Sequence, residues 1–416
     1  MPLSLILSAH LLNPGVWVLP EKLNRLHGLD TLRALAIVSV MIFHLQASLP
    51  GALDPIGRVG WMGVDLFFVL SGFLIGTQLL QPLAAARPLL LLDFYVRRGF
   101  RVLPASFAVL LLYMCVPAWR EQPNLPAVWK FLTFTQNLCM HFPHERAFSH
   151  AWSLCVEEQF YLLLPPLVLL CRRWLCGIRK TILLLGAVLL LGVLVRGWEL
   201  FHVVRSAGLS DNQAGALFMK RIYYPTYSRL DGLWMGVAVA LVRCFRPGWW
   251  AHAARSHSLA NVLGAAGLCI AGVATWSFGA EYPSADQAAG VLFGFPLLSL
   301  GLALLVSSAA SGKGLLCKRL PGMQMVATLA FSLYLTHKEV AHLDQWMWPW
   351  LRTQNGWGAA AVYAVTCAGC ATALYWLVER PFLLLRVRLT SGPASPAGLR
   401  QTRRSIETEA RLDPAL

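Results

Sequence analysis

The sequence predicts an all-α membrane protein, a polytopic bundle of about ten transmembrane helices with both termini in the cytoplasm. Three observations support this class. First, 57% of the 416 residues are hydrophobic and only 13% are charged, whereas soluble proteins carry about 25% charged residues. Second, the mean hydropathy is +0.56, and apolar runs of membrane-spanning length recur along the chain. Third, the basic residues fall in short clusters between these runs.

Ten apolar runs have the length needed to cross a bilayer, roughly 17–25 residues. They show no period-two alternation, so we expect helices rather than the strands of a barrel. The runs lie near 33–50, 61–81, 102–118, 152–170, 181–198, 230–245, 259–278, 288–308, 325–344 and 359–378.

The orientation of the bundle follows from its lysines and arginines. They cluster in 22–33, 87–101, 172–180, 243–255, 313–319 and the C-terminal segment, whereas the 279–287 loop contains none. The positive-inside rule places such basic segments in the cytoplasm. The same distribution explains the net charge of +15 without a nucleic-acid partner.

The two ends of the chain differ from the apolar centre. Residues 1–24 lack the basic region and cleavage site of a signal peptide, so we expect them to lie at the membrane interface. Residues 389–416 are polar, which predicts a disordered cytoplasmic tail and leaves 25–388 as the membrane domain. The ten cysteines form no Cys/His cluster with metal-ligand spacing, so no metal is predicted.

The first run, "RALAIVSVMIFH", begins with Arg33 and ends with His44. The ten intervening residues put both side chains on one helix face, about 16 Å apart along the axis. With Arg33 at the cytoplasmic boundary, His44 lies inside the membrane. An ionisable residue is costly there and therefore indicates function. The structural alternative is a histidine that merely hydrogen-bonds a neighbouring helix.

The next two runs and their flanks add further polar side chains. Asp65 and Ser71 stand in the second run, where Gly63 and Gly72 favour close helix packing. Three arginines crowd the predicted inner mouth of the third run, and guanidinium groups match the geometry of phosphate. Ordinary membrane anchoring is the alternative for this cluster, which consists of Arg97, Arg98 and Arg101.

The fourth run contains Ser153 and Glu157, one helical turn apart. A carboxylate within reach of a histidine would orient the ring and raise its basicity. A carboxylate at the outer interface, neutralised by a basic residue, is the alternative.

Later runs also carry charge. Arg229 and Asp231 begin the sixth run, where an ion pair with each other or with neighbours is the simpler interpretation. His337 lies beside two charged residues in the ninth run, which suggests a break or a water-filled cavity there. Glu379 and Arg380 follow the tenth run and are expected to form a structural pair.

Together these segments resemble the acyltransferase-3 family of integral membrane proteins, which transfer acyl groups, usually acetyl, to carbohydrates and related acceptors. The resemblance covers residues 25 to 385, nearly the whole membrane part. It is carried, in order along the chain, by "LDTLRALAIVSVMIFH", "GVDLFFVLSGFLI", "FYVRRGFRVLP", "AWSLCVEEQFYLLLP", "SRLDGLWMG", "FSLYLTH" and "VERPF".

The resemblance implies roles for individual residues. Arg33 and His44 match the family's arginine and essential histidine, and His44 is expected to act as general base or, alternatively, as an acyl-imidazole nucleophile. Glu157 is expected to orient His44. The donor is expected to be cytoplasmic acetyl-CoA, its phosphates held by Arg33, Arg97, Arg98 and Arg101. Candidate substrate-binding residues are Asp65, Ser71, Ser153, Arg229, Asp231 and His337.

The resemblance also suggests partners and a location. The acceptor is expected to be a cell-surface polysaccharide or lipopolysaccharide reached from the outer face of a bacterial inner membrane, with Trp119, Trp129, Trp152 and Tyr223 available to stack on sugar rings. Many members carry an additional C-terminal hydrolase-like domain that this sequence lacks, so a separate partner that relays the acyl group stays open, as does the oligomeric state. A transporter or flippase of a sugar or lipid-linked intermediate is the competing hypothesis, and consumption of acyl-CoA distinguishes the two.

Overall fold

The computed structural model describes residues 26–138, 140, 144–175, 178–353 and 355–390. All regular structure in these residues is helical, as predicted. The predicted interfacial segment 1–24 lies outside the described residues, and so do residues 391–416 of the predicted tail. The long helices are α2 (His27–Leu45), α4 (Met62–Ala84), α5 (Leu91–Cys115), α7 (Trp152–Leu175), α8 (Ile178–Trp198), α10 (Asp231–Phe245), α12 (His257–Ser277), α13 (Phe295–Ala310), α14 (Met323–Met347) and α15 (Trp357–Leu374).

Eight helical stretches in the described part of the chain are long and apolar enough to cross a membrane. The two other predicted runs also form helices, but α10 has only 15 residues and the second half of α14 carries several charged side chains. The structure thus supports a multi-pass helical membrane protein, whereas ten spans and cytoplasmic termini stay predictions. The eight stretches are 27–48, 62–84, 91–115, 149–172, 179–207, 257–277, 290–310 and 357–389.

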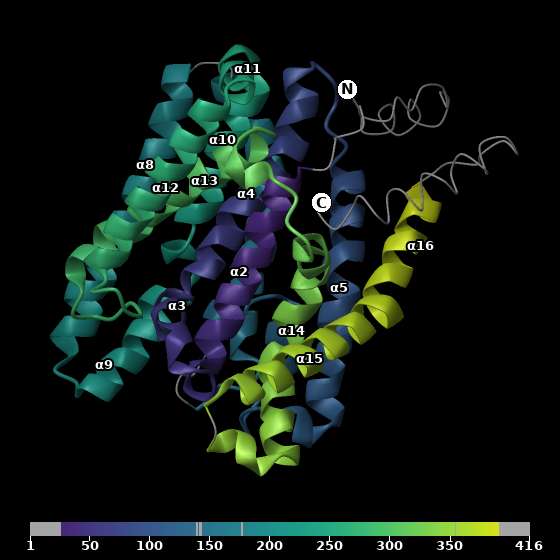
Figure 1. Ribbon diagram of the computed structural model, residues 1–416. Coiled ribbons are helices and arrows are strands. Elements are labelled where there is room, and N and C mark those ends of the chain that lie inside the picture. Colours follow the sequence, from purple (N-terminus) through teal and green to yellow (C-terminus); the bar gives the residue numbers. More distant parts are fainter. Residues whose placement is uncertain (1–25, 139, 141–143, 176–177, 354, 391–416) are drawn as a thin grey trace, which may run out of the picture.

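Short helices and π-helical turns connect the long elements. The short helices are α3 (Asp54–Val59), α6 (Val128–Leu132), α9 (Asp211–Phe218), α11 (Pro247–Arg255) and α16 (Arg380–Thr390). A π turn over Tyr375–Glu379 joins α15 to α16, and the two form one long rod in Figure 1. The same view places α8, α12 and α13 on one side of α2 and α4, and α5 and α16 on the other.

Small residues set the closest helix contact in the bundle, between α4 and α10. A methyl group placed on Gly72 would come within 2.0 Å of the Leu233 carbonyl oxygen. One on Gly236 would come within 2.2 Å of the Val69 carbonyl oxygen. The two backbones therefore touch, as small residues permit between membrane helices.

The prediction that Gly63 allows close packing is also confirmed. A methyl group there would lie 2.5 Å from the carbonyl oxygen of Ala36 on α2. A similar contact joins α12 to α13, where a methyl group on Gly267 would lie 2.6 Å from the Gly301 carbonyl oxygen. Backbone-to-backbone packing thus fixes α2, α4 and α10 against one another.

Two buried ion pairs connect the same region. One guanidinium nitrogen of Arg229 hydrogen-bonds both carboxylate oxygens of Asp65 on α4, at 2.9 and 3.1 Å. Arg196 on α8 binds Asp231 on α10 through two nitrogens, at 2.6 and 3.1 Å. All four side chains are at least nine-tenths buried. Because removing one partner of such a pair leaves an unpaired charge, these contacts lock α4, α8 and α10 together.

We expect Gly236→Ala to lower the midpoint of thermal unfolding in detergent by at least about 3 °C, because overpacking of this kind costs about 1–3 kcal/mol. The control is Gly272→Ala on α12, where the added methyl group meets no atom within 4 Å. That variant should unfold at or slightly above the wild-type temperature. Equal midpoints for the two variants would contradict the close approach of α4 and α10.

Candidate functional site

Five helices, α2, α4, α5, α7 and α14, surround a cavity of about 120 Å³. The volume is well below that of a pocket for a drug-sized ligand, so only a thin chain or a few water molecules fit inside. Apolar side chains form part of the wall. The polar and aromatic lining residues are Arg33, Phe67, Ser71, Arg98, Arg101, Ser153, Glu157, Tyr161, Phe331 and Tyr334.

Three of the four arginines expected to bind the donor line this cavity, namely Arg33, Arg98 and Arg101. Arg97, the fourth, does not line the cavity, and its part in donor binding stays a prediction. Its side chain is about half exposed and binds Asp93 on its own helix at 2.9 Å. Successive helical residues point about 100° apart, so Arg97 and Arg98 cannot face the same cavity from one helix.

Carboxylates hold each cavity arginine in place. Arg98 lies 3.9 Å from Glu157 and 3.6 Å from Glu158, and its guanidinium stacks over Tyr161 at 3.9 Å from the ring centroid. Arg33 lies 3.8 Å from Asp30. These contacts orient the guanidinium groups, each of which offers five N–H donors.

The carboxylate that pairs with Arg101 belongs to a residue far along the chain. Its Nη1 lies 2.7 Å from Glu379, which also accepts a hydrogen bond from Ser332 at 2.9 Å. The predicted pair of Glu379 with Arg380 is therefore wrong. Arg380 instead stacks over Trp376, 4.2 Å from the ring centroid.

The expected contact between Glu157 and His44 is also corrected. One Glu157 oxygen accepts a hydrogen bond from Ser71 at 2.9 Å and the other from Tyr161 at 3.0 Å. Glu157 and Ser71 therefore belong to the wall of the arginine cavity, where they help to hold Arg98. Ser153 joins the same wall and hydrogen-bonds the Tyr334 hydroxyl at 2.6 Å.

The residue that contacts His44 is His337. His44 Nδ1 and His337 Nε2 lie 2.9 Å apart. His337 is fully buried, and its own Nδ1 lies 3.0 Å from the carbonyl oxygens of both Leu333 and Tyr334. Carbonyl oxygens only accept, so His337 Nδ1 carries a proton and its Nε2 accepts one from His44 Nδ1.

This tautomer has a chemical consequence. Because His44 donates through Nδ1, its Nε2 keeps a free lone pair in the neutral ring. His44 is also the exposed member of the pair. The arrangement of an orienting group, an imidazole and an accessible nitrogen is the one that general-base catalysis requires.

The histidine pair and the arginine cavity are adjacent, although His44 does not line the cavity. Tyr334 forms the end of the cavity wall. Its ring centroid lies 6.2 Å from that of His337, one turn farther along α14. His337 was predicted as a substrate-binding residue. The structure places it fully buried and in contact with His44, and its predicted contact with substrate stays a prediction.

Three other predicted substrate residues have structural partners. Asp65 and Arg229 pair with each other, and Asp231 pairs with Arg196. Arg229 is further enclosed by the rings of Phe295 and Tyr223, with centroids at 4.1 and 4.5 Å. These groups hold the bundle together rather than face a ligand.

The predicted sugar-stacking aromatics are mostly inside the protein. Trp119, Trp152 and Tyr223 are all buried, whereas Trp129 is 55% exposed. Trp152 packs on Tyr223 with a ring separation of 5.1 Å. Of the four, only Trp129 is placed to contact a ligand from solution.

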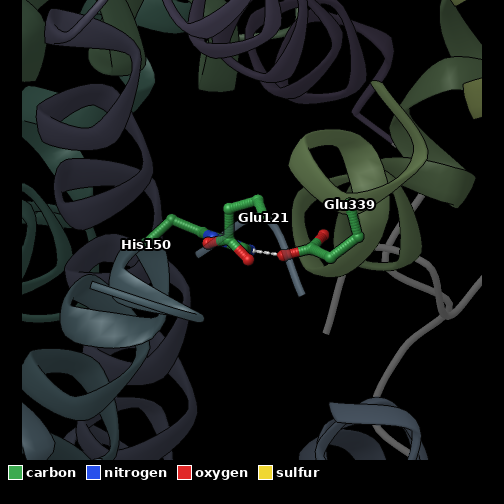
Figure 2. Close-up of side chains that lie close together, drawn as sticks. All are labelled: Glu121, His150 and Glu339. Carbon is green, nitrogen blue, oxygen red and sulfur yellow. Dashed lines mark ion pairs between the residues drawn. The ribbon is translucent and has the colours of Figure 1, made fainter. Parts of the chain in front are cut away.

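One polar cluster was not predicted from the sequence. His150 and Glu339 approach to 3.7 Å between Nε2 and Oε1, and Glu121 completes a group whose ligand atoms all lie within 4.8 Å of one another. Figure 2 shows the three side chains pointing toward a common centre. Glu339 lies in the ninth predicted run, beside His337 and Lys338. Its partners in the cluster, Glu121 and His150, come from two distant segments.

Comparison with known proteins agrees with this architecture. Residues 26–376 match the family model Acyl_transf_3, described as an acyltransferase domain. The chain is 27% identical over 329 residues to "Peptidoglycan O-acetyltransferase OatA" of Listeria monocytogenes, covering 76% of this chain and 49% of that protein. It is 31% identical over 233 residues to "O-acetyltransferase OatA" of Staphylococcus aureus, covering 52% and 34%.

The chain thus spans about half or less of the length of these curated relatives. No solved structure matches it. The family model nevertheless covers most of the chain, including both histidines and all three cavity arginines. The chain therefore belongs to the membrane acyltransferase family that this model, Acyl_transf_3, represents.

Proposed function

We propose that this protein is a membrane O-acetyltransferase of the bacterial inner membrane. It moves an acetyl group from cytoplasmic acetyl-CoA to a hydroxyl of a cell-surface carbohydrate. The observation that carries the proposal is the His44–His337 pair, which presents a free imidazole nitrogen next to a cavity lined by arginines. The names of the relatives, both O-acetyltransferases, support the same chemistry and favour a sugar of peptidoglycan as the acceptor.

Donor binding is assigned to the arginine cavity. A nucleotide is too large for a cavity of about 120 Å³, so only the thin pantetheine arm enters. Arg98 and Arg101 donate N–H groups to the amide carbonyl oxygens of this arm, and Arg33 lines the cavity beside them. The arm then runs past Tyr334 and brings the thioester to the histidine pair.

The chemical step needs a base that removes the proton of the acceptor hydroxyl and a group that then gives a proton to the departing thiolate. His44 Nε2 takes the proton of the acceptor hydroxyl while the hydroxyl oxygen attacks the thioester carbonyl carbon. The carbon–sulfur bond breaks, and the thiolate of CoA receives the proton back from the imidazolium of His44. His337 holds the ring and accepts from Nδ1 throughout. In the alternative path, Nε2 itself attacks the carbonyl carbon, the carbon–sulfur bond breaks and CoA leaves as its thiolate. The acceptor hydroxyl then attacks the acyl-imidazole, the bond from the acyl carbon to Nε2 breaks, and the hydroxyl proton passes to the thiolate of CoA.

The transporter hypothesis receives no support from the comparisons, since the matching family and both relatives are named for acyl transfer. The two functions differ in one measurable respect. A transporter leaves acetyl-CoA intact, whereas an acetyltransferase releases one CoA for each acetyl group moved.

His44→Ala should reduce the release of CoA from acetyl-CoA by at least about 100-fold, because general-base catalysis contributes about 10²–10⁴-fold. The assay follows free thiol and transfer of labelled acetyl to peptidoglycan fragments and other cell-surface saccharides, with the full chain in proteoliposomes. His342→Ala, on the same helix as His337, is the matched control and should retain activity. Wild-type protein that consumes no acetyl-CoA with any acceptor would refute the proposed activity.

His337→Ala should lower kcat about 10- to 100-fold with little change in the KM for acetyl-CoA, because the imidazole of His44 loses the group that fixes its orientation. His337→Gln restores an acceptor oxygen near the position of Nε2, so it should recover part of the loss. A purely structural role predicts no such rescue. Equal kcat for the alanine and glutamine variants would therefore contradict the positioning role.

Arg98→Lys should raise the KM for acetyl-CoA about tenfold or more, because a lysine keeps the charge but loses the fork that spans Glu157, Glu158 and the donor. The matched control is Arg97→Lys, one residue away and outside the cavity, which should leave the KM unchanged. If the two variants have the same KM, the arginine cavity is not the donor site.

A further inference from the structure

We propose that Glu121, His150 and Glu339 form a binding site for a divalent metal ion, with Zn²⁺ as the best match. The three residues come from separate segments. Glu121 lies in the connection between α5 and α6, His150 lies directly before α7, and Glu339 lies on α14. One imidazole nitrogen and two carboxylate oxygens are a donor set that zinc uses in proteins. The proposal does not depend on acyl transfer.

The spacing of the donor atoms fits such an ion. Ligands at about 2.0–2.2 Å from tetrahedral zinc lie about 3.3–3.5 Å from one another. His150 Nε2 and Glu339 Oε1 are 3.7 Å apart, and all three ligand atoms fall within 4.8 Å of one another. Small side-chain adjustments therefore bring them to bonding distance. Figure 2 shows the three groups converging from different segments.

Polar atoms of His150 and Glu339 lack hydrogen-bond partners, although both oxygens of Glu121 have them. His150 is 3% exposed and Glu339 is fully buried. Neither ring nitrogen of His150 has a hydrogen-bond partner in the described part of the chain, and neither has Glu339 Oε2. Buried polar groups without partners are rare, because each loses its hydrogen bonds to water and gains none in the protein. A metal ion bound to His150 Nε2 and Glu339 would satisfy two such groups at once.

The charges of the two glutamates and of the neighbouring lysine also favour a bound metal ion. The Lys338 ammonium lies 3.3 Å from Glu121 Oε1 and compensates one carboxylate. Among the described residues, the basic side chain that pairs with Glu339 is His150, which carries charge only if protonated. One negative charge is thus left in a buried site, where an uncompensated charge is very costly.

A proton on Glu339 is the competing explanation. The Tyr113 hydroxyl contacts both carboxylates, at 2.8 Å from Glu121 Oε2 and within hydrogen-bonding distance of Glu339. A protonated Glu339 would donate to this hydroxyl and remove the charge. It would leave His150 Nε2 without a partner, however, whereas a metal ion binds this nitrogen. The unpartnered histidine therefore favours the metal.

The site would have a structural effect on the catalytic histidines. The ring of His150 lies 5.3 Å from that of His337, which holds His44. A metal bound here ties the segments before α6 and α7 to α14, one turn or less from His337. It would keep α14 at the position from which His337 reaches α2.

The first test is a metal titration of the full chain, purified in detergent and stripped with a chelator. Equilibrium dialysis against Zn²⁺, Mn²⁺ or Mg²⁺, read by mass spectrometry of the bound metal, should give one zinc per chain. Manganese should bind more weakly and magnesium not measurably, since a histidine-containing site favours zinc over hard cations. Absence of stoichiometric zinc in wild-type protein overturns the proposal without reference to any variant.

The second test separates the metal from the proton. Glu339→Gln has the shape of a protonated glutamate and loses the negative charge. It should weaken zinc binding at least about 100-fold and abolish the rise in unfolding temperature that zinc gives the wild type. Asp344→Asn is the matched control, a buried acid on the same helix that instead accepts a hydrogen bond from Thr366 at 2.6 Å.

Asp344→Asn should bind zinc as tightly as the wild type. Glu339→Gln that binds zinc normally would overturn the assignment of Glu339 as a ligand. A Glu339→Gln protein as stable as the wild type, with no effect of zinc on either, would establish the buried proton instead.

Discussion

A charge buried among apolar helices must find its counter-charge within the bundle, because lipid offers neither ions nor hydrogen bonds. The structure meets this condition with pairs that link different helices. Arg229 binds Asp65, and Arg196 binds Asp231. Since one partner of each pair stands at a helix start, these contacts fix where α4, α8 and α10 meet. The Gly72–Leu233 contact then brings α4 and α10 together at backbone distance.

The same constraint forms the candidate active site. Arg98 and Arg101 enter the cavity already paired with carboxylates, which holds the guanidinium groups in fixed positions. Glu157 is fixed in turn by Ser71 and Tyr161. A site assembled from paired charges can be rigid without strong net charge. In the proposed function, the acyl donor binds to guanidinium groups that are already held in place.

The histidine pair follows a different principle, in which backbone carbonyls decide the proton positions. Two carbonyl oxygens on α14 fix the proton on His337 Nδ1, and this fixes the direction of the bond to His44. The free nitrogen of His44 is thus set by the fold of α14. The His150 cluster, beside the same helix, shows that polar groups concentrate around this point of the bundle.

The sequence by itself determined the helical membrane class, the family and several site residues. Composition and run length suffice for the class, since a chain this apolar can only be satisfied in lipid as helices. The motif "RALAIVSVMIFH" identified Arg33 and His44 because spacing along one helix is a local property. The arginine cluster is local for the same reason, and two of its three members, Arg98 and Arg101, line the cavity.

Only the tertiary structure decided which groups meet. The partner of His44 is His337, separated by 293 residues, and the partner of Arg101 is Glu379 rather than a sequence neighbour. The sequence suggested Glu157 as the partner of His44, and it suggested Arg380 rather than Arg101 as the partner of Glu379. Helix packing brings together residues that are far apart in the sequence, and no periodic pattern in the sequence predicts such contacts. The proposed metal ligands are likewise at positions 121, 150 and 339, so a search for local metal-ligand spacing could not find them.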